Sequence, residues 1–211
     1  MSEISYWKKN LPMWITYSRI VITVPILYAM LQESLHWQVF CVAGFILASI
    51  SDYYDGYYAR KWNVVSNMGK FMDPVADKIL VTSVLTILTY QQKIDPWMAI
   101  IIFGRDNYIA GLRSVAASDQ MVISAGQSGK LKTTVQMIGI PMMILGNQLY
   151  AILTDWFRIQ HIALDYLRLS VDIEKIGYFI LWFGVALSIW SGIQYYWAFI
   201  KTTRSPKGAV E

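Results

Sequence analysis

The stretch Asp52-Tyr-Tyr-Asp55-Gly-Tyr-Tyr-Ala-Arg60 ends one apolar segment of the chain, and Asp73 and Asp77 begin the next one. The first two aspartates are three residues apart and the last two are four apart, so each pair shares one face of a helix. A charged side chain at the centre of a bilayer is unfavourable by about 2.5–3.5 kcal/mol, so these positions indicate a function. The sequence therefore predicts two helices that bring four carboxylates together at one face of a membrane.

The composition of the whole chain agrees with this prediction. Of its 211 residues, 55% are hydrophobic and only 15% are charged, whereas a soluble domain has roughly 25% charged residues. These values, with a mean hydropathy of +0.38, argue against an ordinary soluble domain and exclude intrinsic disorder. The single cysteine, Cys41, excludes an internal disulfide framework and a cysteine metal cluster. No dense stripe of Lys and Arg is present, which argues against a nucleic-acid partner.

The apolar runs predict an all-α integral membrane protein that forms one domain over residues 1–211. We expect six transmembrane helices, near residues 12–31, 37–60, 73–90, 96–117, 131–153 and 176–200. Before the first span, Ile4, Trp7 and Leu11 share a helical face beside two lysines, which predicts an N-terminal amphipathic helix at the membrane interface. Residues 154–172 mix apolar and charged side chains and fit either a second surface helix or a plain loop.

The basic residues favour one orientation of these spans. Most Lys and Arg residues beside the spans fall on the side that also holds the two termini and the four aspartates. The other side has only Lys93, Arg158 and Arg168, with Lys175 at its edge. Under the positive-inside rule the first side is cytoplasmic, so we expect both termini and the acidic cluster to face the cytoplasm.

Four carboxylates close together repel one another unless a cation neutralises them. Oxygen ligands alone suit hard divalent cations such as Mg²⁺, Mn²⁺ or Ca²⁺, and two such ions suit phosphoryl chemistry. Gly56 and Ala59 continue the face of the first two aspartates, and their small side chains let a bulky ligand approach the helix. A helix cap or a headgroup-level charge explains each aspartate singly, but not four on two facing helices.

These residues belong to a longer pattern with fixed spacing, Asp52-x2-Asp55-Gly56-x2-Ala59-Arg60-x8-Gly69-x3-Asp73-x3-Asp77. At all eight positions the pattern resembles the signature of the CDP-alcohol phosphotransferases. Four further strings resemble the bacterial phosphatidylglycerophosphate synthases of that family: Asn10-Leu-Pro12-x3-Thr16-x2-Arg19, Asp73-Pro-Val-Ala-Asp77-Lys78, Arg105-Asp106 with Gly111-Leu-Arg113, and Gly129-Lys130-x-Lys132-Thr133-x2-Gln136. The commoner pair at the third string is Arg-Glu, so Asp106 is shorter by one methylene.

The resemblance implies that CDP-diacylglycerol and sn-glycerol 3-phosphate give phosphatidylglycerol phosphate and CMP. It implies a multi-pass enzyme of a bacterial inner membrane, surrounded by membrane lipids, active as a homodimer and dependent on two Mg²⁺ or Mn²⁺ ions. The implied metal ligands are Asp52, Asp55, Asp73 and Asp77, and the last of them is also the implied catalytic base. The implied CDP-lipid site consists of Asp52, Gly56, Ala59, Arg60, Thr16 and Arg19.

Four basic residues predict a pocket for an anionic acceptor. Arg105 and Arg113 are eight residues apart, an offset of about 80° around a helix, so both side chains can face one cavity. Lys130 and Lys132 stand at the cytoplasmic start of the fifth span. A phosphate monoester needs such cations, and arginine can bind it through two hydrogen bonds. The alternative is that these side chains snorkel to the membrane surface.

Other functions remain open at this point. The acceptor in this family can instead be inositol phosphate, serine or a second phosphatidylglycerol. An intramembrane prenyltransferase also uses aspartates and Mg²⁺, but it spaces its acidic motifs differently. A divalent-cation transporter needs acidic groups along a path near the bilayer midplane, whereas the aspartates here gather at the ends of two spans.

Overall fold

The computed structural model describes residues 6–32, 34–61, 67–118, 121, 127–146 and 173–204. Within these ranges, the side chains of residues 6–12, 52–61, 67–71, 73, 74, 77, 127 and 204 are not described. The described part of the chain consists of six α-helices and contains no β-strand. The helices are α1 (Tyr6–Met30), α2 (Leu35–Lys61), α3 (Asn67–Tyr90), α4 (Pro96–Ser118), α5 (Gln127–Leu145) and α8 (Ile173–Arg204).

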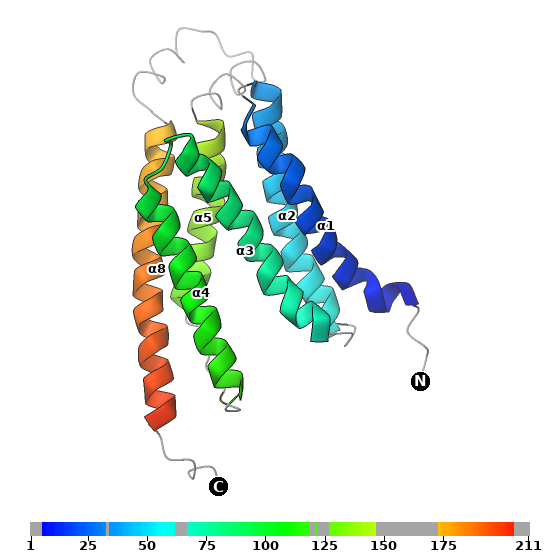
Figure 1. Ribbon diagram of the computed structural model, residues 1–211, viewed down its shortest axis with the longest axis vertical. Helices are drawn as coiled ribbons and strands as arrows, with labels where there is room; N and C mark the ends of the chain where they lie inside the picture. Colours follow the sequence, from blue (N-terminus) through cyan, green and yellow to red (C-terminus); the bar gives the residue numbers. More distant parts are fainter. Residues whose placement is uncertain are drawn as a thin grey trace.

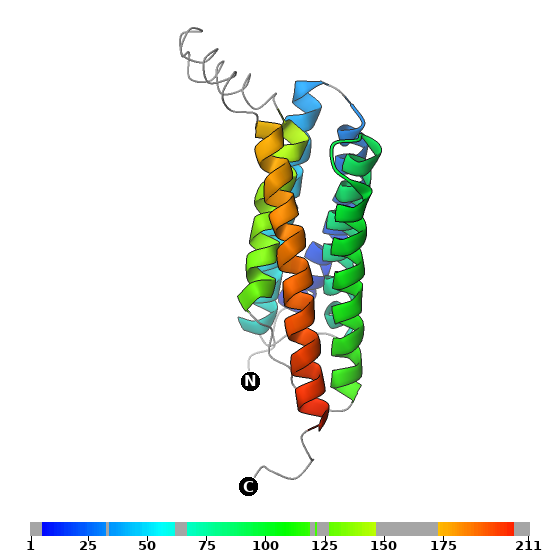
Figure 2. The same cartoon turned by 90° about the vertical axis from the view of Figure 1, so that its left-hand side faces the viewer.

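The helices run alternately up and down, so their ends fall into two groups (Figure 1). We call the group where α1, α3 and α5 end the upper end, and the group where α2, α4 and α8 end the lower end. α5 packs along α8 and α1 packs along α2, while α3 contacts both α1 and α4 and joins the two sides of the bundle. Figure 2 shows the same bundle from the side, with α4 and α8 next to each other. The start of α1 and the end of α8 both lie at the lower end.

The prediction of an all-α fold is confirmed, but several helix ends differ from the expected spans. α3 begins at Asn67 rather than near residue 73, and α8 extends the expected last span at both ends. The fifth span was expected to reach residue 153, whereas α5 ends at Leu145. Gly146 adopts a φ of +49° and its N–H donates to the Met142 carbonyl at 2.8 Å, a geometry that terminates a helix. Residues 154–172, expected to form a surface helix or a loop, lie outside the described residues.

The expected N-terminal surface helix is not separate from the first span. One helix, α1, covers both, and Figure 1 shows its first turns bent away from the axis of the rest. Pro12 lies in this region and has no N–H to donate, and a proline within a helix produces a bend. The sequence therefore predicted the change of direction but not the continuity of the helix.

Two described helical segments have the length and apolar composition to cross a membrane, Met13–Met30 of α1 and Ile173–Thr203 of α8. Shorter apolar stretches lie in α2 (Leu35–Ser51) and α3 (Lys78–Tyr90). The helices without such a segment, α2 to α5, carry most of the charged residues of the predicted site, whereas Arg19 lies on α1. Composition therefore suggests a membrane protein without establishing six spans.

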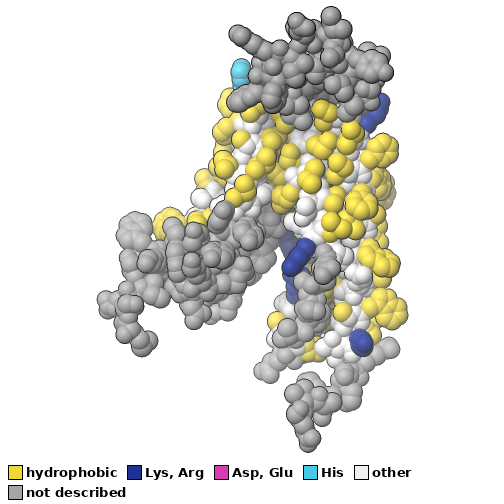
Figure 3. All heavy atoms as spheres, turned by 180° about the vertical axis from the view of Figure 1, so that it is seen from behind, with side chains coloured by type: hydrophobic (Ala, Val, Ile, Leu, Met, Phe, Trp, Pro, Cys, Tyr) yellow, Lys and Arg dark blue, Asp and Glu magenta, His cyan; other side chains and the backbone are white. Residues whose placement is uncertain are grey.

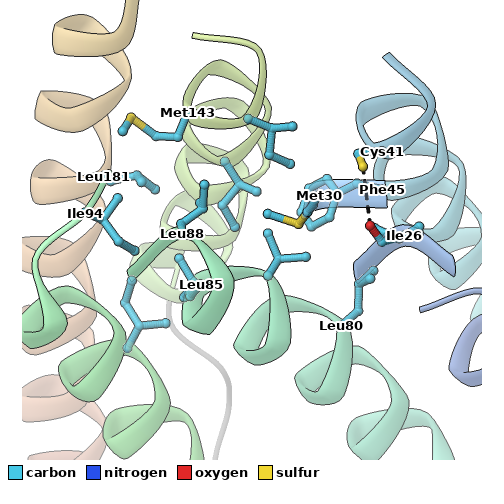
Figure 4. Packing of buried hydrophobic residues seen from close by; sticks show 14 of the residues in the cluster. Ile26, Met30, Cys41, Phe45, Leu80, Leu85, Leu88, Ile94, Met143 and Leu181 are labelled. Atoms are coloured by element: carbon cyan, nitrogen blue, oxygen red, sulfur yellow. Dashed lines mark hydrogen bonds between the residues drawn. The ribbon is translucent and has the colours of Figure 1, made fainter. Parts of the chain in front are cut away.

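The apolar core fills the upper half of the bundle (Figure 4). Met30 and Phe45 from α1 and α2 face Leu88 from α3, and the cluster continues to Met143 and Leu181 of α5 and α8. All five side chains are buried. Close packing of the side chains in this cluster gives van der Waals contacts among all six described helices, so this half of the molecule helps to fix their positions.

A glycine allows α5 and α8 to pack closely in this core. A Cβ atom added at Gly139 would lie 2.8 Å from Cδ2 of Leu181, well below a normal contact distance. The absence of a side chain therefore determines how near the two helices come.

At the upper end, polar side chains form hydrogen bonds to backbone carbonyls at the ends of α1 and α5. Gln91 Nε2 donates to the carbonyl of Met30, the last residue of α1, at 2.6 Å. Lys93 Nζ donates to the carbonyls of Met143 and Ile144 at 3.2 and 3.3 Å, in the last turn of α5. A cation at the C-terminus of a helix satisfies unpaired carbonyls and is also favoured by the helix dipole. The short connection between α3 and α4 thus ties together the ends of two other helices.

Candidate active site

The four predicted metal ligands lie on the two helices that the acidic pattern predicted. Asp52 and Asp55 are in the last three turns of α2, and Asp73 and Asp77 are in the first three turns of α3. α2 and α3 contact each other, and both of these segments lie at the lower end (Figure 1). The side chains of these aspartates, and those of the predicted CDP-lipid residues Gly56, Ala59 and Arg60, lie outside the described residues, so their convergence remains a prediction.

A polar contact connects this region to α4. Lys78, which follows Asp77 in the chain, places Nζ 3.5 Å from Oδ1 of Asn107. Asn107 in turn lies two residues after Arg105, a predicted acceptor residue. The contact is long for a hydrogen bond, but it brings the acidic part of α3 beside the charged part of α4.

Arg105, Asp106 and Lys132 form an ionic cluster between α4 and α5. Lys132 Nζ donates to both carboxylate oxygens of Asp106, at 2.5 and 2.6 Å. Arg105 Nη1 donates to Asp106 Oδ1 at 3.0 Å. The side chains are 5% exposed for Lys132, 18% for Arg105 and 22% for Asp106. Two of the four predicted acceptor residues therefore lie together, and one carboxylate, which the sequence analysis did not assign to the site, holds both.

The cluster contains a buried donor that no described residue satisfies. Among the residues that the structure describes, Arg105 Nε is buried without a hydrogen-bond partner, and so is Nε2 of Gln136, one turn beyond Lys132 on α5. A buried donor without a partner is unfavourable by about 1–3 kcal/mol, so both atoms are suited to bind a ligand oxygen.

The other two predicted acceptor residues lie elsewhere. Arg113 is exposed, and its guanidinium carbon stands 5.5 Å from the centre of the Tyr195 ring on α8. Lys130 is exposed at the start of α5 and belongs to no described ion pair. Figure 3 shows basic side chains in and beside a hollow in the lower half of the molecule. The snorkelling alternative therefore fits Lys130 better than Lys132.

The predicted CDP-lipid residues of α1 face the interior of the bundle. Thr16 and Arg19 are one turn apart and are both buried, with 0% and 2% of their surfaces exposed. Both lie near the middle of α1. Their contact with the diphosphate stays a prediction.

The sequence analysis missed the part of the site that α8 supplies. Ser191 Oγ accepts a hydrogen bond from Arg105 Nη2 at 2.7 Å, and Gly192 lies against the stem of the same arginine. A signal was present in the sequence, since Ser191, Gly192 and Tyr195 share one face of a helix that is otherwise almost entirely apolar.

The model of the CDP-alcohol phosphatidyltransferase family matches residues 9–190, most of the chain and all of the predicted metal ligands. The chain belongs to this family. Three bacterial relatives are named CDP-diacylglycerol–glycerol-3-phosphate 3-phosphatidyltransferase. The *Bacillus subtilis* protein is 34% identical, with 92% of this chain and 98% of the relative covered. The *Mycoplasma pneumoniae* protein is 43% identical, with 66% and 69% covered, and the *Rickettsia typhi* protein is 35% identical, with 89% and 96% covered.

CDP-alcohol phosphatidyltransferases generally depend on a divalent metal. The donor set on α2 and α3 fits such an ion, since carboxylate oxygens suit hard divalent cations and each aspartate pair has helical spacing. Elsewhere in the described residues, no group of three or more His, Cys, Asp or Glu side chains could hold a metal.

Proposed function

We propose that this chain transfers the phosphatidyl group of CDP-diacylglycerol to sn-glycerol 3-phosphate, giving phosphatidylglycerol phosphate and CMP. Membership of the family supports the enzyme class, and the names of the relatives support the two substrates. The observation that carries the choice of acceptor is a pair of neighbouring cations, the half-buried Arg105 and the buried Lys132, held on one carboxylate. Two adjacent cations, with a buried N–H of Arg105 that no described residue satisfies, suit the phosphate of a small phosphorylated alcohol.

The membrane arrangement is part of the same proposal. All six described helices, α1 to α5 and α8, would cross a bacterial inner membrane, with both termini and the lower end in the cytoplasm. The excess of basic residues on that side supports this orientation. The lipid substrate would remain in the bilayer while the water-soluble acceptor enters from the lower end. A homodimer is proposed from the family resemblance alone.

Asp52, Asp55, Asp73 and Asp77 would hold Mg²⁺ or Mn²⁺, as two ions. When bound there, divalent cations neutralise negative charge on the diphosphate and on the departing CMP. The four carboxylates would keep this charge at the lower end of α2 and α3, where the acceptor can reach it.

The protein's own residues would then bind and orient the reactants. Gly56 and Ala59 would leave room for the cytidine, and Arg60 would contact a phosphate. Thr16 and Arg19 would approach the diphosphate from α1, where their burial supports an inward direction. None of these contacts requires a movement of the apolar core.

The reaction would transfer one proton and exchange one bond. Asp77 would accept the proton of the acceptor hydroxyl as that oxygen attacks the phosphorus that carries the diacylglycerol. The bond between this phosphorus and the oxygen of CMP would break, and CMP would leave. Arg105 and Lys132 would hold the phosphate of glycerol 3-phosphate, which positions the hydroxyl for attack.

The proposal is tested by CMP release from CDP-diacylglycerol by the purified full chain in lipid nanodiscs. The acceptors compared are glycerol 3-phosphate, inositol phosphate and serine, each with Mg²⁺ and with Mn²⁺. We expect release with glycerol 3-phosphate, abolished by a chelator. Release with serine alone would overturn the choice of acceptor, and uptake of metal into vesicles without any need for CDP-lipid would favour a transporter.

A further inference from the structure

The lower half of α8 presents three buried residues, Ser191, Gly192 and Tyr195, on one helix face. We call them the α8 stripe. The neighbouring residues of the same helix segment that point away from this face are large, apolar or aromatic, and exposed: Trp190, Ile193, Tyr196 and Trp197. The α8 stripe therefore faces the bundle, while the rest of this segment has the surface of a lipid-facing helix.

Ser191 holds the guanidinium of Arg105 in one orientation. Its Oγ accepts from Nη2 at 2.7 Å and donates to the Ser188 carbonyl at 3.1 Å. Because the hydroxyl proton is committed to that carbonyl, the oxygen lone pairs are directed toward the arginine. A hydrogen bond to a charged donor is stronger than one between neutral groups, so this contact outweighs most single contacts of a buried serine.

Gly192 and Asp106 complete the fixation of Arg105. A Cβ atom added at Gly192 would lie 3.4 Å from Arg105 Cγ, so the arginine stem runs closely over the bare backbone of α8. Asp106 accepts from Nη1. With both Nη atoms bound, the guanidinium cannot rotate freely, and its buried Nε–H, which has no partner among the described residues, points in a fixed direction.

Tyr195 performs a similar role for Arg113. Its ring is buried, with 6% of its surface exposed, and the guanidinium of Arg113 stands 5.5 Å from the ring centre. Arg113 is exposed and would otherwise sample many rotamers, so a cation–π contact holds it toward α8.

We propose that Ser191 and Tyr195 are positioning residues, which set the affinity for the phosphate of the acceptor by fixing Arg105 and Arg113. The inference rests on the proposed function, which assigns Arg105 to the acceptor, and on the sequence prediction that Arg113 faces the same pocket. It extends the site to α8, beyond residue 190, where the match to the family model ends.

The test compares Ser191→Ala with Ser188→Ala in the full chain in nanodiscs. Ser188 is a matched control, since it is equally buried, lies one turn away, and its hydroxyl donates to the Gly184 carbonyl of its own helix. We expect Ser191→Ala to raise KM for glycerol 3-phosphate about tenfold, the loss of one hydrogen bond to a charged group. KM for CDP-diacylglycerol should remain within about twofold, and Ser191→Thr, which keeps the hydroxyl, should restore most of the affinity.

Tyr195 supplies a second pair of variants. Tyr195→Phe keeps the aromatic face and should leave KM for glycerol 3-phosphate near that of the unchanged chain, whereas Tyr195→Leu should raise it about threefold. This pair decides the inference if Ser191→Ala does not yield folded protein.

The inference is overturned if Ser191→Ala and Ser188→Ala change the acceptor KM equally, or if Ser191→Ala changes both KM values alike. An unchanged chain that shows no dependence on glycerol 3-phosphate would instead refute the proposed function. The Ser191→Ala and Ser188→Ala variants, and the two Tyr195 variants, are then compared with the acceptor that the chain does use. If the two members of each pair have equal KM values for that acceptor, the positioning role is refuted as well.

Discussion

The upper and lower halves of the bundle are stabilised by different interactions. In the upper half, apolar side chains from all six helices pack together, and polar groups such as Lys93 serve helix ends. In the lower half, Lys132 is buried and forms an ionic cluster with Asp106 and Arg105. Packing of apolar side chains does not depend on the direction of hydrogen-bond donors, whereas an ionic cluster does. The difference indicates that packing in the upper half fixes the helices, so that the charged side chains of the lower half can keep their hydrogen-bond geometry.

The largest expected effect comes from removing a carboxylate at the lower end while leaving the upper end unchanged. Asp77→Asn should reduce CMP release by about 10²- to 10⁴-fold, because the proposed general base is lost. Asp95→Asn is the control, since Asp95 accepts a hydrogen bond from Tyr178 at the upper end and should keep most activity. Similar losses in both variants, or substantial CMP release by a folded Asp77→Asn protein, would contradict the assignment of Asp77.

The next effect concerns the ionic cluster itself. Asp106→Ala leaves Lys132 buried without its carboxylate and should lower the free energy of unfolding by about 3–5 kcal/mol. The double change Asp106→Ala with Lys132→Met should recover part of this loss, because the buried ammonium of Lys132 is removed while Arg105 keeps its hydrogen bond to Ser191. The measurement is unfolding in mixed micelles followed by tryptophan fluorescence. Additive losses in the double variant would show that the two side chains are not energetically coupled.

A cavity in the apolar half should affect stability without changing acceptor affinity. Leu88 is fully buried in the core, so Leu88→Ala should lower the free energy of unfolding by about 2–5 kcal/mol. KM for glycerol 3-phosphate should stay within about twofold at a temperature where the variant is folded. A large change in KM would show that the two halves are not separable in this way.

The smallest effect is expected where a polar group serves only a helix end. Lys93→Met removes the two hydrogen bonds to the carbonyls of Met143 and Ile144, and should destabilise the protein by about 1–2 kcal/mol. Activity at low temperature should be retained. A loss of activity comparable to that of Asp77→Asn would mean that the upper end takes part in the reaction.

The sequence predicted what depends on local pattern. The order of the helices and the placement of the aspartate pairs on two successive helices follow from the apolar runs and from helical periodicity. The end of α5 was missed, because the apolar run continues past Gly146 and only the positive φ of that residue terminates the helix.

The contacts of the ionic cluster could not be predicted, because they depend on how helices distant in the chain pack together. Lys132 and Asp106 are 26 residues apart and Ser191 and Arg105 are 86 apart. Spacing along one helix predicted that Arg105 and Arg113 could face one cavity, but not that α8 would hold each of them by a different side chain.

The contact between Arg105 and Asp106 also bears on how the chain enters a membrane. In the proposed membrane arrangement, helices that enter the bilayer in chain order would bring α4 into the lipid before α5. The ionisable residues of α4 would then lack the partner that Lys132 later provides. Because the two neighbours form an ion pair within α4, this helix carries much of its own neutralisation at that moment. Lys132 then brings a charge for which a carboxylate is already in place. The order of the elements in the gene is thus also an order in which the buried charges can be accommodated one at a time.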